Sequence, residues 1–228
     1  MPSTKVEIFP PHGWIQLEQS CGTDLDVVNC AKVSFAKHSD TFAEHERGVL
    51  KFLMKHRHGT PFEHNYFKFH VRAPIFVIRE WQRHRIGVSY NEESGRYVEM
   101  RPDFYIPQQA RVQKGTPGKY SFKSGSLEQS ALLATYTADN AREAYHRYLH
   151  LLNEGVAKEQ ARAVLPLTLY SEFYFSCNAR SLMNFISLRT SNEAMFEIKE
   201  YAKILFLLWS KEMPETAEAF QECDFISP

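Results

Sequence analysis

The chain has 228 residues and a mass of 26.5 kDa, which fits one large domain or two small ones, and we expect one. Hydrophobic residues at 43% and charged residues at 24% exclude a disordered or fibrous protein. Basic and acidic residues total 27 each, so the overall charge that would attract a nucleic-acid backbone or an anionic membrane is absent. The longest apolar run, Ile204–Trp209, is far shorter than the roughly 20 residues of a membrane span.

The four cysteines show no close pair and no spacing typical of a metal site. Residues 1–20 lack the basic-then-apolar pattern of an export signal. We therefore expect a reduced, cytoplasmic protein.

The first half of the chain predicts two short helices around one strand. Residues 40–55 and 74–82 have helical patterns. Residues 66–73 alternate apolar and polar side chains with a period of two, which is typical of a half-buried strand. The side chains expected to face inward are Phe67, Phe69 and Val71.

The second half predicts a second strand and three helices. Residues 134–152 and 195–209 repeat apolar side chains every three or four residues, and Gly155 provides a stop signal after the first of them. Residues 167–177 alternate like a strand, and residues 178–188 fit a shorter helix. In the strand we expect these side chains to face inward: Leu167, Leu169, Phe173, Phe175 and Cys177. The outward set is Thr168, Tyr170, Glu172 and Tyr174.

Helices outnumber strands and do not alternate strictly with them, which predicts an α+β fold with a mixed or antiparallel sheet. Residues 108–126 are dense in Gly, Pro, Lys and Ser and predict a long, flexible surface loop. The segments on either side look incomplete alone, so we expect a single domain over residues 1–228.

A basic segment at the end of the second helix is the first candidate for chemistry. Its Arg83-His84-Arg85 triplet precedes a polar turn around Ser94-Gly95-Arg96. Simple capping of the helix end by cations accounts for one or two of these residues but not for all of them. Guanidinium groups bind phosphate and carboxylate oxygens bidentately, so we predict an anion-binding pocket here.

A histidine-rich segment, residues 56–64, is the second candidate. Thr60, Pro61 and Glu63 have the spacing of a helix capping box, which is a structural explanation for them. Histidines at positions 56, 58, 64 and 70 suggest a metal site, but cysteines and sufficient carboxylates are missing nearby. We therefore predict no metal.

The helix at residues 178–188 is the third candidate. Asn178 is a natural N-cap, and Arg180 and Asn184 share a face at four-residue spacing. Leu182, Phe185 and Ile186 form the opposite, apolar face. The polar face is either solvated or turned toward a ligand, and this helix alone does not decide between them.

Four blocks in order resemble the flavin-dependent thymidylate synthase family: HGTPFEH (58–64), RHR followed by SYNEESGRY (83–97), ARAVLPL (161–167) and NARSLMNFISLR (178–189). Residues 26–35 are similar to the first helix of that family. The family signature is Arg-His-Arg, seven residues, then Ser. Here eight residues, 86–93, precede Ser94, so we place the extra residue within 86–88, where Gly87 could absorb it as a bulge.

The resemblance implies a homotetramer with flavin and nucleotide sites at subunit interfaces. It implies that deoxyuridine monophosphate (dUMP) receives a methylene from methylenetetrahydrofolate and becomes thymidylate (dTMP). FAD reduced by NADPH would supply the hydride.

Matching positions imply the residue roles. FAD would be held by Thr60, Arg83, His84, Arg85, Asn178, Arg180 and Asn184, with His58 beside the flavin and Glu92 between flavin and nucleotide. The nucleotide would be bound by Glu80, Arg83, Glu92, Glu93, Ser94, Gly95, Arg96, Arg162 and Arg189. Arg189 would also be catalytic, because a guanidinium beside the uracil imide favours its ionised, more nucleophilic form.

Two rival functions use the same residues. A nucleic-acid-binding module would use the arginines with Tyr90, Tyr97 and Tyr105 as stacking platforms, but zero net charge and the acidic pair Glu92–Glu93 oppose it. A metal-dependent hydrolase would use the histidines of residues 56–70, but it lacks carboxylate ligands.

Overall fold

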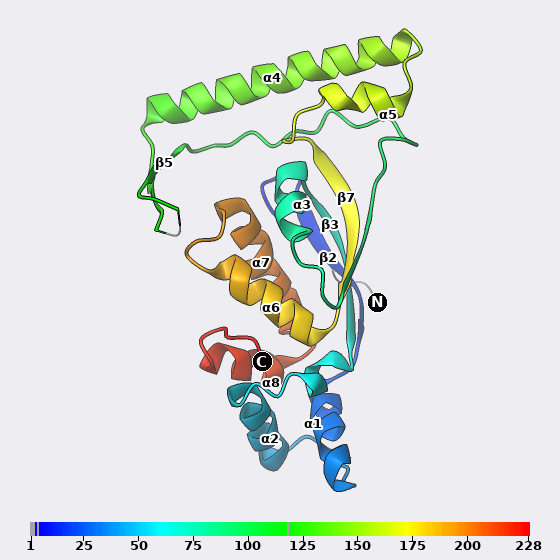
Figure 1. Cartoon of the computed structure of the whole chain (residues 1–228), viewed down its shortest axis with the longest axis vertical. Helices are drawn as coiled ribbons and strands as arrows, with labels where there is room; N and C mark the ends of the chain where they lie inside the picture. The colour runs from blue at the N-terminus through cyan, green and yellow to red at the C-terminus, as the bar shows by residue number, and fades with distance from the viewer. Residues whose placement is uncertain (1–2, 4, 118) are drawn as a thin grey trace.

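A computed structural model describes residues 3, 5–117 and 119–228 of the chain. Helices pack on one face of an antiparallel sheet, so the predicted α+β fold is confirmed (Figure 1). In spatial order the sheet contains β1 (Val6–Glu7), β2 (Trp14–Cys21), β3 (Tyr66–Pro74), β7 (Tyr170–Cys177) and β4 (Val88–Glu92). Every neighbouring pair is antiparallel.

The central strand β3 follows the predicted alternation. Phe67, Phe69 and Val71 are fully buried, whereas His70 faces the other side of the sheet and stacks on Tyr174 with ring centroids 4.5 Å apart. This burial of one face fixes the register, because a one-residue slip would expose three large apolar side chains.

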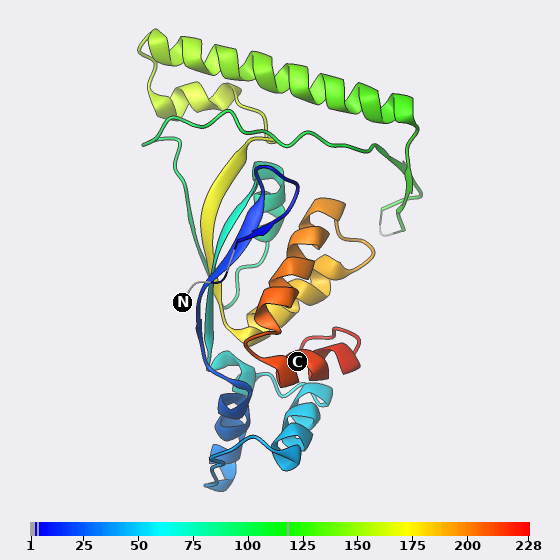
Figure 2. The same ribbon diagram turned by 180° about the vertical axis from the view of Figure 1, so that it is seen from behind.

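Three helices cover the apolar face of the sheet: α3 (Ile75–Trp81), α6 (Ala179–Thr190) and α7 (Phe196–Trp209). Figure 2 shows α6 and α7 packed against each other on one side of the strands. Trp81 is fully buried at the centre of this layer, 4.9 Å from the ring of Phe185 and 5.6 Å from that of Phe175. The two helices and the sheet therefore share one core, which holds α6 rigidly against the strands.

One end of the molecule consists of α1 (Asp24–Lys32), α2 (Glu44–Lys55) and α8 (Pro214–Glu222) (Figure 1). A short 3₁₀ helix, η1 (Val33–Phe35), continues α1. The Asp24 carboxylate accepts hydrogen bonds from the backbone N–H groups of Glu215 and Thr216 at the start of α8. This carboxylate, which satisfies free amides at a helix N-terminus, ties α1 to α8.

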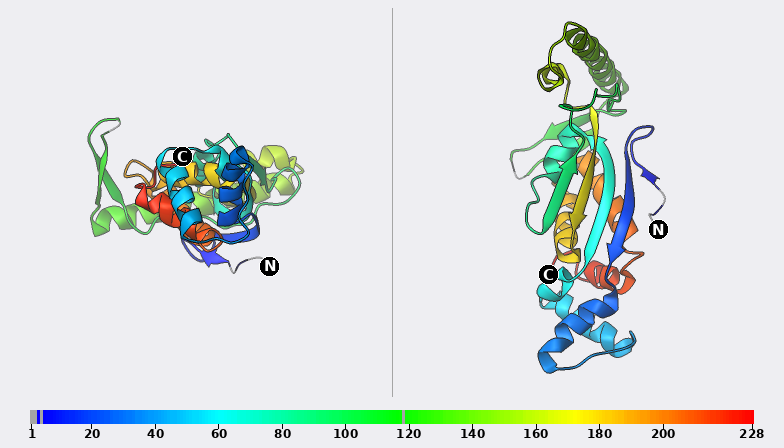
Figure 3. Two further views of the ribbon diagram at one scale, coloured as in Figure 1. Left: turned by 90° about the horizontal axis from the view of Figure 1, so that it is seen from below. Right: turned by 90° about the vertical axis from the view of Figure 1, so that its right-hand side faces the viewer.

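The opposite end carries α4 (Leu127–Asn153), the short α5 (Lys158–Ala161) and the 3₁₀ turn η3 (Arg162–Val164). The C-terminal half of α4 packs against Met100 and Leu169 through the fully buried Tyr148. Figure 3 shows α4 lying across the end of the molecule, with its N-terminal part extending beyond the sheet. Gly155 ends this helical region with φ at +78°, as the sequence predicted.

Two predicted segments differ in the structure. Strand β7 begins at Tyr170 rather than Leu167, because a turn follows Pro166 and only Leu169 makes an isolated bridge, to Phe104. Leu167 is 51% exposed instead of buried. Tyr170, expected to face outward, is 3% exposed because the N-terminal segment covers it, with the ring of His12 5.6 Å away.

The segment at residues 108–126 contains a β-hairpin instead of an irregular loop. Its strands are β5 (Arg111–Lys114) and β6 (Ser121–Ser124), which pair with one another and with no strand of the main sheet. The hairpin projects from the body at the start of α4 (Figure 1). Its flexibility stays a prediction.

Candidate functional site

Helix α6 connects two polar regions that the sequence singled out. At its start, Asn178 accepts a hydrogen bond from the Ser181 backbone N–H at 2.9 Å, which confirms the predicted N-cap. At its end, Arg189 lies against the end of α3. A single helix therefore fixes the distance and direction between the two polar regions.

A cavity of about 1250 Å³ lies at the start of α6, and we call it the α1–α2 cavity. Its walls come from α1, η1, α2 and η2 (Thr60–Glu63). His58, Thr60 and Arg180, all predicted to hold a cofactor, line it. Its other basic lining residues are Lys32, Lys37, His45, Arg57 and His64. A space of this size with a basic wall suits a large anionic ligand.

Gly59 and Glu63 hold Arg180 at the wall of this cavity. A Cβ at Gly59 would overlap the Arg180 guanidinium, so glycine permits the close approach. The guanidinium pairs with the Glu63 carboxylate and donates to the Pro228 carbonyl oxygen at 3.2 Å. The predicted Thr60–Glu63 capping box is therefore wrong. Gly59 is the N-cap of η2, and the Glu63 carboxylate pairs with the charged Arg180 guanidinium instead of with a backbone N–H group.

The loop between α3 and β4 packs on the same end of α6. The Ser181 hydroxyl donates to the Ile86 carbonyl oxygen at 3.1 Å, and Gly87 has φ at +66°. Strand β4 pairs with β7 in unbroken register from Val88 onward, so the extra residue is absorbed by this loop and not by a bulge in the ladder. Gly87 is the residue type that tolerates this conformation without strain.

The other end of α6 forms a tightly bonded cluster. Arg189 donates from Nε to His84 Nε2 at 2.9 Å, and from its two terminal nitrogens to the Glu80 carboxylate and the Glu80 carbonyl oxygen at 2.8 and 2.9 Å. All three partners lie on α3 or immediately after it. The guanidinium is therefore oriented by bonds on every one of its nitrogens.

His84 is neutral in this cluster. It is 8% exposed, and burial together with the neighbouring Arg189 lowers the pKa of His84 to about 4. A neutral imidazole keeps a lone pair on Nε2, which is what the Arg189 N–H requires. The Tyr90 hydroxyl lies 2.9 Å from the carbonyl oxygens of both Trp81 and His84 and so anchors the turn that carries the imidazole.

Arg83 and Arg85 flank this buried histidine and are both exposed. Within the described parts of the chain, neither has an ion pair or a side-chain hydrogen bond. These two guanidinium groups and the half-buried, oriented Arg189 form a cationic surface that an anion would complete.

The polar turn after β4 forms a third group of predicted residues. Gly95 is buried, with Arg162 and Met100 packed on it so closely that a Cβ would lie 3.0 Å from each. The Ser94 hydroxyl accepts from the Arg96 backbone N–H at 3.3 Å, and Arg96 Nε lies 3.2 Å from Glu159. The turn thereby brings Arg162 together with the half-buried hydroxyl of Ser94 and the exposed guanidinium of Arg96.

Glu92 links this turn to α3. The side-chain amide of Gln82 donates to its carboxylate at 3.3 Å. Partial withdrawal from water raises the pKa of Glu92, and the charge of Glu93 adds to the rise, although the side chain is still partly exposed. Glu93 itself lies 3.2 Å from Arg101.

Asn184, which was predicted to hold the cofactor, and three further residues also belong to these regions. Asn184 is exposed on α6 and makes no side-chain hydrogen bond within the described part of the chain. Gln82 and Ser181 were not predicted as site residues, and Tyr90 was predicted only for the nucleic-acid-binding alternative. Only Tyr90 had a sequence signal, an aromatic residue within a polar segment.

The described residues contain no group of three or more histidine, cysteine, aspartate or glutamate side chains that could hold a metal ion. Within the same residues, no helix has both the length and the apolar character needed to cross a membrane.

The fold and this arrangement define a class of protein: an α+β chain in which separate segments contribute basic side chains to a large cavity and to the two ends of α6. The family described as thymidylate synthase complementing protein matches residues 16–215, and the chain belongs to it. Proteins named flavin-dependent thymidylate synthase are similar throughout: that of Streptomyces coelicolor is 45% identical, with 94% of this chain and 93% of the relative covered. That of Thermosipho africanus is 42% identical, with 91% and 90% covered.

Solved structures agree with the family. A UMP/dUMP methylase, PolB from Streptomyces cacaoi, bound with 5-Br dUMP, matches with a TM-score of 0.86 and 39% identity, covering 94% of this chain and 97% of that one. The same enzyme bound with 5-Br UMP matches with a TM-score of 0.87.

Proposed function

We propose that the protein converts dUMP to dTMP by reductive methylation with FAD as its redox cofactor. Family membership and relatives at 40–45% identity over nearly the whole chain support the reaction. The observation that carries the proposal is the cationic surface around His84, where Arg83 and Arg85 are free and Arg189 is fixed.

The residues around the α1–α2 cavity fit an FAD molecule. The cavity volume of about 1250 Å³ and its basic wall suit a dinucleotide with a pyrophosphate, and Gly59 lets the Arg180 guanidinium lie close against the backbone at that wall. The residues that would hold FAD are His58, Thr60, Arg83, His84, Arg85, Glu92, Asn178, Arg180 and Asn184. When bound, FAD supplies the hydride that completes the methyl group.

The turn after β4 would bind the nucleotide. A phosphate monoester needs several donors, which Ser94, Gly95, Arg96 and Arg162 provide together with Arg83. Glu80, Glu92 and Glu93 would define the side facing the base. Because no histidine forms a hydrogen bond with the Ser94 hydroxyl among the described residues, Ser94 acts as a binding donor and not as a nucleophile.

Arg189 would polarise the uracil ring. A guanidinium beside the imide favours the anionic form of the ring and raises the nucleophilicity of C5. The neutral His84 orients the Arg189 guanidinium without adding a second positive charge, and the Glu80 carboxylate fixes its direction. Arg189 is thus the catalytic residue of the proposal.

The further substrates and the assembly are also proposed. Methylenetetrahydrofolate would donate the carbon, and NADPH would reduce FAD, in the cytoplasm. The chain would form a homotetramer, since large apolar side chains on α4 lack cover: Leu127 is 90%, Leu132 53% and Tyr136 67% exposed.

Product analysis tests this function. We expect purified protein supplied with FAD, NADPH, methylenetetrahydrofolate and dUMP to form dTMP, detected by mass spectrometry, and to form none when FAD is removed and withheld. Absence of dTMP under complete conditions, together with salt-dependent retention on DNA, would instead favour the nucleic-acid-binding alternative.

A further inference from the structure

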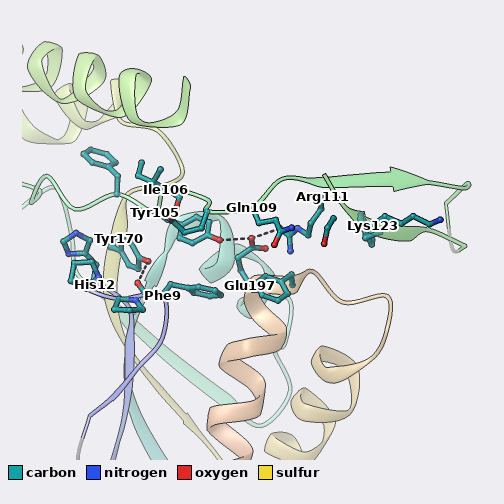
Figure 4. A pocket seen from close by; sticks show the side chains of 16 residues that line it. Phe9, His12, Tyr105, Ile106, Gln109, Arg111, Lys123, Tyr170 and Glu197 are labelled. Carbon is teal, nitrogen blue, oxygen red and sulfur yellow. Dashed lines mark hydrogen bonds and ion pairs between the residues drawn. The ribbon is translucent and has the colours of Figure 1, made fainter. Parts of the chain in front are cut away.

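A second cavity, of about 800 Å³, lies between the N-terminal segment, the β5–β6 hairpin and the start of α7 (Figure 4). None of the residues assigned above to flavin or nucleotide lines it. Its volume falls within the range of small-molecule sites. We name it the Glu197 cavity after the carboxylate in its wall.

Glu197 is an unusual residue for an apolar cavity. It is 2% exposed, and its Oε1 accepts from the Tyr105 hydroxyl at 3.1 Å and from Arg111 at 2.6 Å. Its Oε2 is also buried but has no hydrogen-bond partner among the described residues. A buried carboxylate oxygen left unpaired is costly, so the structure favours an additional donor at this position.

The charges nearby restrict what that donor is. The guanidinium of Arg111 already balances the charge of Glu197, and Lys123 adds a second cation to the lining. A cationic ligand would be repelled by these two groups, whereas a neutral N–H donor would satisfy Oε2 without adding charge. The same two cations suit an anionic group on another part of the ligand.

The walls of the cavity favour a planar ring. Phe9 contacts Tyr105 edge-on, with ring centroids 5.3 Å apart, and lies 6.0 Å from Phe196. The Arg111 guanidinium lies over the Phe196 ring at 4.9 Å. Figure 4 shows Phe9 and Tyr105 next to Glu197, with Tyr170 on their far side. Aromatic walls of this kind stack with planar heterocycles.

We propose that the Glu197 cavity is a second ligand site, for a planar heteroaromatic compound that donates ring N–H groups to Glu197 and presents an anionic group to Arg111 and Lys123. Burial and the Glu197 charge raise the pKa of Tyr105, so its hydroxyl remains a donor at all working pH values.

Pterin-6-carboxylate is a suitable probe, because it is planar, fluorescent, and carries adjacent N–H donors and a carboxylate. We expect saturable binding to the FAD-loaded protein in the presence of excess dUMP, followed by probe fluorescence. Glu197→Gln, which replaces the Oε2 acceptor by a donor, should weaken binding at least about tenfold. No binding, or equal affinity in the two proteins, would overturn the proposal.

Lys123→Gln supplies a second test, because Lys123 is exposed and its substitution leaves the core intact. This variant should weaken pterin-6-carboxylate severalfold while leaving neutral 6-methylpterin unaffected. An equal effect on both probes contradicts the assigned role. Lys37→Gln serves as the control for the α1–α2 cavity, because Lys37 lines that cavity, is exposed and has no role in the proposed flavin site. Loss of probe binding in that variant alone would place the probe there and overturn the proposal.

Discussion

Arg189, the catalytic residue of the proposed function, is held in one direction by its hydrogen bonds. Its guanidinium is bonded to His84 and twice to Glu80, so that its direction is set before any substrate binds. Preorganised charge of this kind costs no reorganisation during the reaction.

We expect Arg189→Ala to lower dTMP formation about 10–1000-fold. Without the guanidinium, the pKa of the uracil imide should be higher by about 1–3, so less of the reactive anion forms. Flavin absorbance should be unchanged, because the α1–α2 cavity is intact. Arg189→Lys keeps the charge but not the three-way bonding, and it should recover part of the rate. A wild-type rate in Arg189→Ala would remove the catalytic role.

His84 carries a pH prediction. Its pKa of about 4 in the folded chain is below the ordinary value of 6.5, so the unfolded chain binds a proton first as the pH falls. The free energy of unfolding should therefore decrease between pH 6.5 and 4, by up to about 3 kcal/mol from this residue. His84→Gln should lack that component, measured by urea unfolding at several pH values. Identical acid slopes in both proteins would show that the histidine is not neutral.

At the scale of elements, a strand could be predicted from the sequence only where its apolar and polar residues alternate regularly. Strand β3 was predictable because its alternation is complete and one face is buried. Strand β2 was missed because its register shifts between Leu17 and Gln19, and that shift breaks the period of two. Strand β4 is short and mostly polar, so the pattern around Tyr90 carried no strand signal.

The site was predictable in part. The resemblance supplied the identity of its residues, but their pairing depends on the fold. Arg189 and Glu80 are 109 residues apart, and only the packing of α6 beside α3 brings them together. Glu63 was misassigned to a cap because spacing alone does not reveal that Arg180 reaches it from across 117 residues.

The α3–β4 loop provides an element-scale test. Gly87→Ala should lower the free energy of unfolding by about 1–3 kcal/mol, since φ is +66° and the new Cβ would overlap Ser181. Gly155→Ala is the matched control, because it has φ at +78° but no atom within 4 Å. Chemical denaturation should rank Gly87→Ala as clearly the more damaging. Equal losses would mean that the loop does not pack on α6 as described.

At the scale of the whole molecule, the proposed assembly concerns the exposed apolar side chains of α4. Its first half exposes Leu132 and Tyr136, and a monomer rarely leaves such a surface in water. We expect light scattering to give four times the chain mass of 26.5 kDa. The double substitution Leu132→Glu with Tyr136→Glu should reduce that mass, whereas Glu128→Gln on the same helix should not. A monomer of the unmodified chain would contradict the proposed assembly.

The central claim is that basic groups from separate segments hold a nucleotide against a bound flavin. Its most direct test is titration of the FAD-loaded protein with dUMP while the visible absorption spectrum of the flavin is recorded. We predict a saturable spectral change, with an affinity about tenfold weaker in Ser94→Ala but with the same flavin content. A flavin spectrum that does not respond to dUMP, or a Ser94→Ala variant with unchanged affinity, would contradict the account.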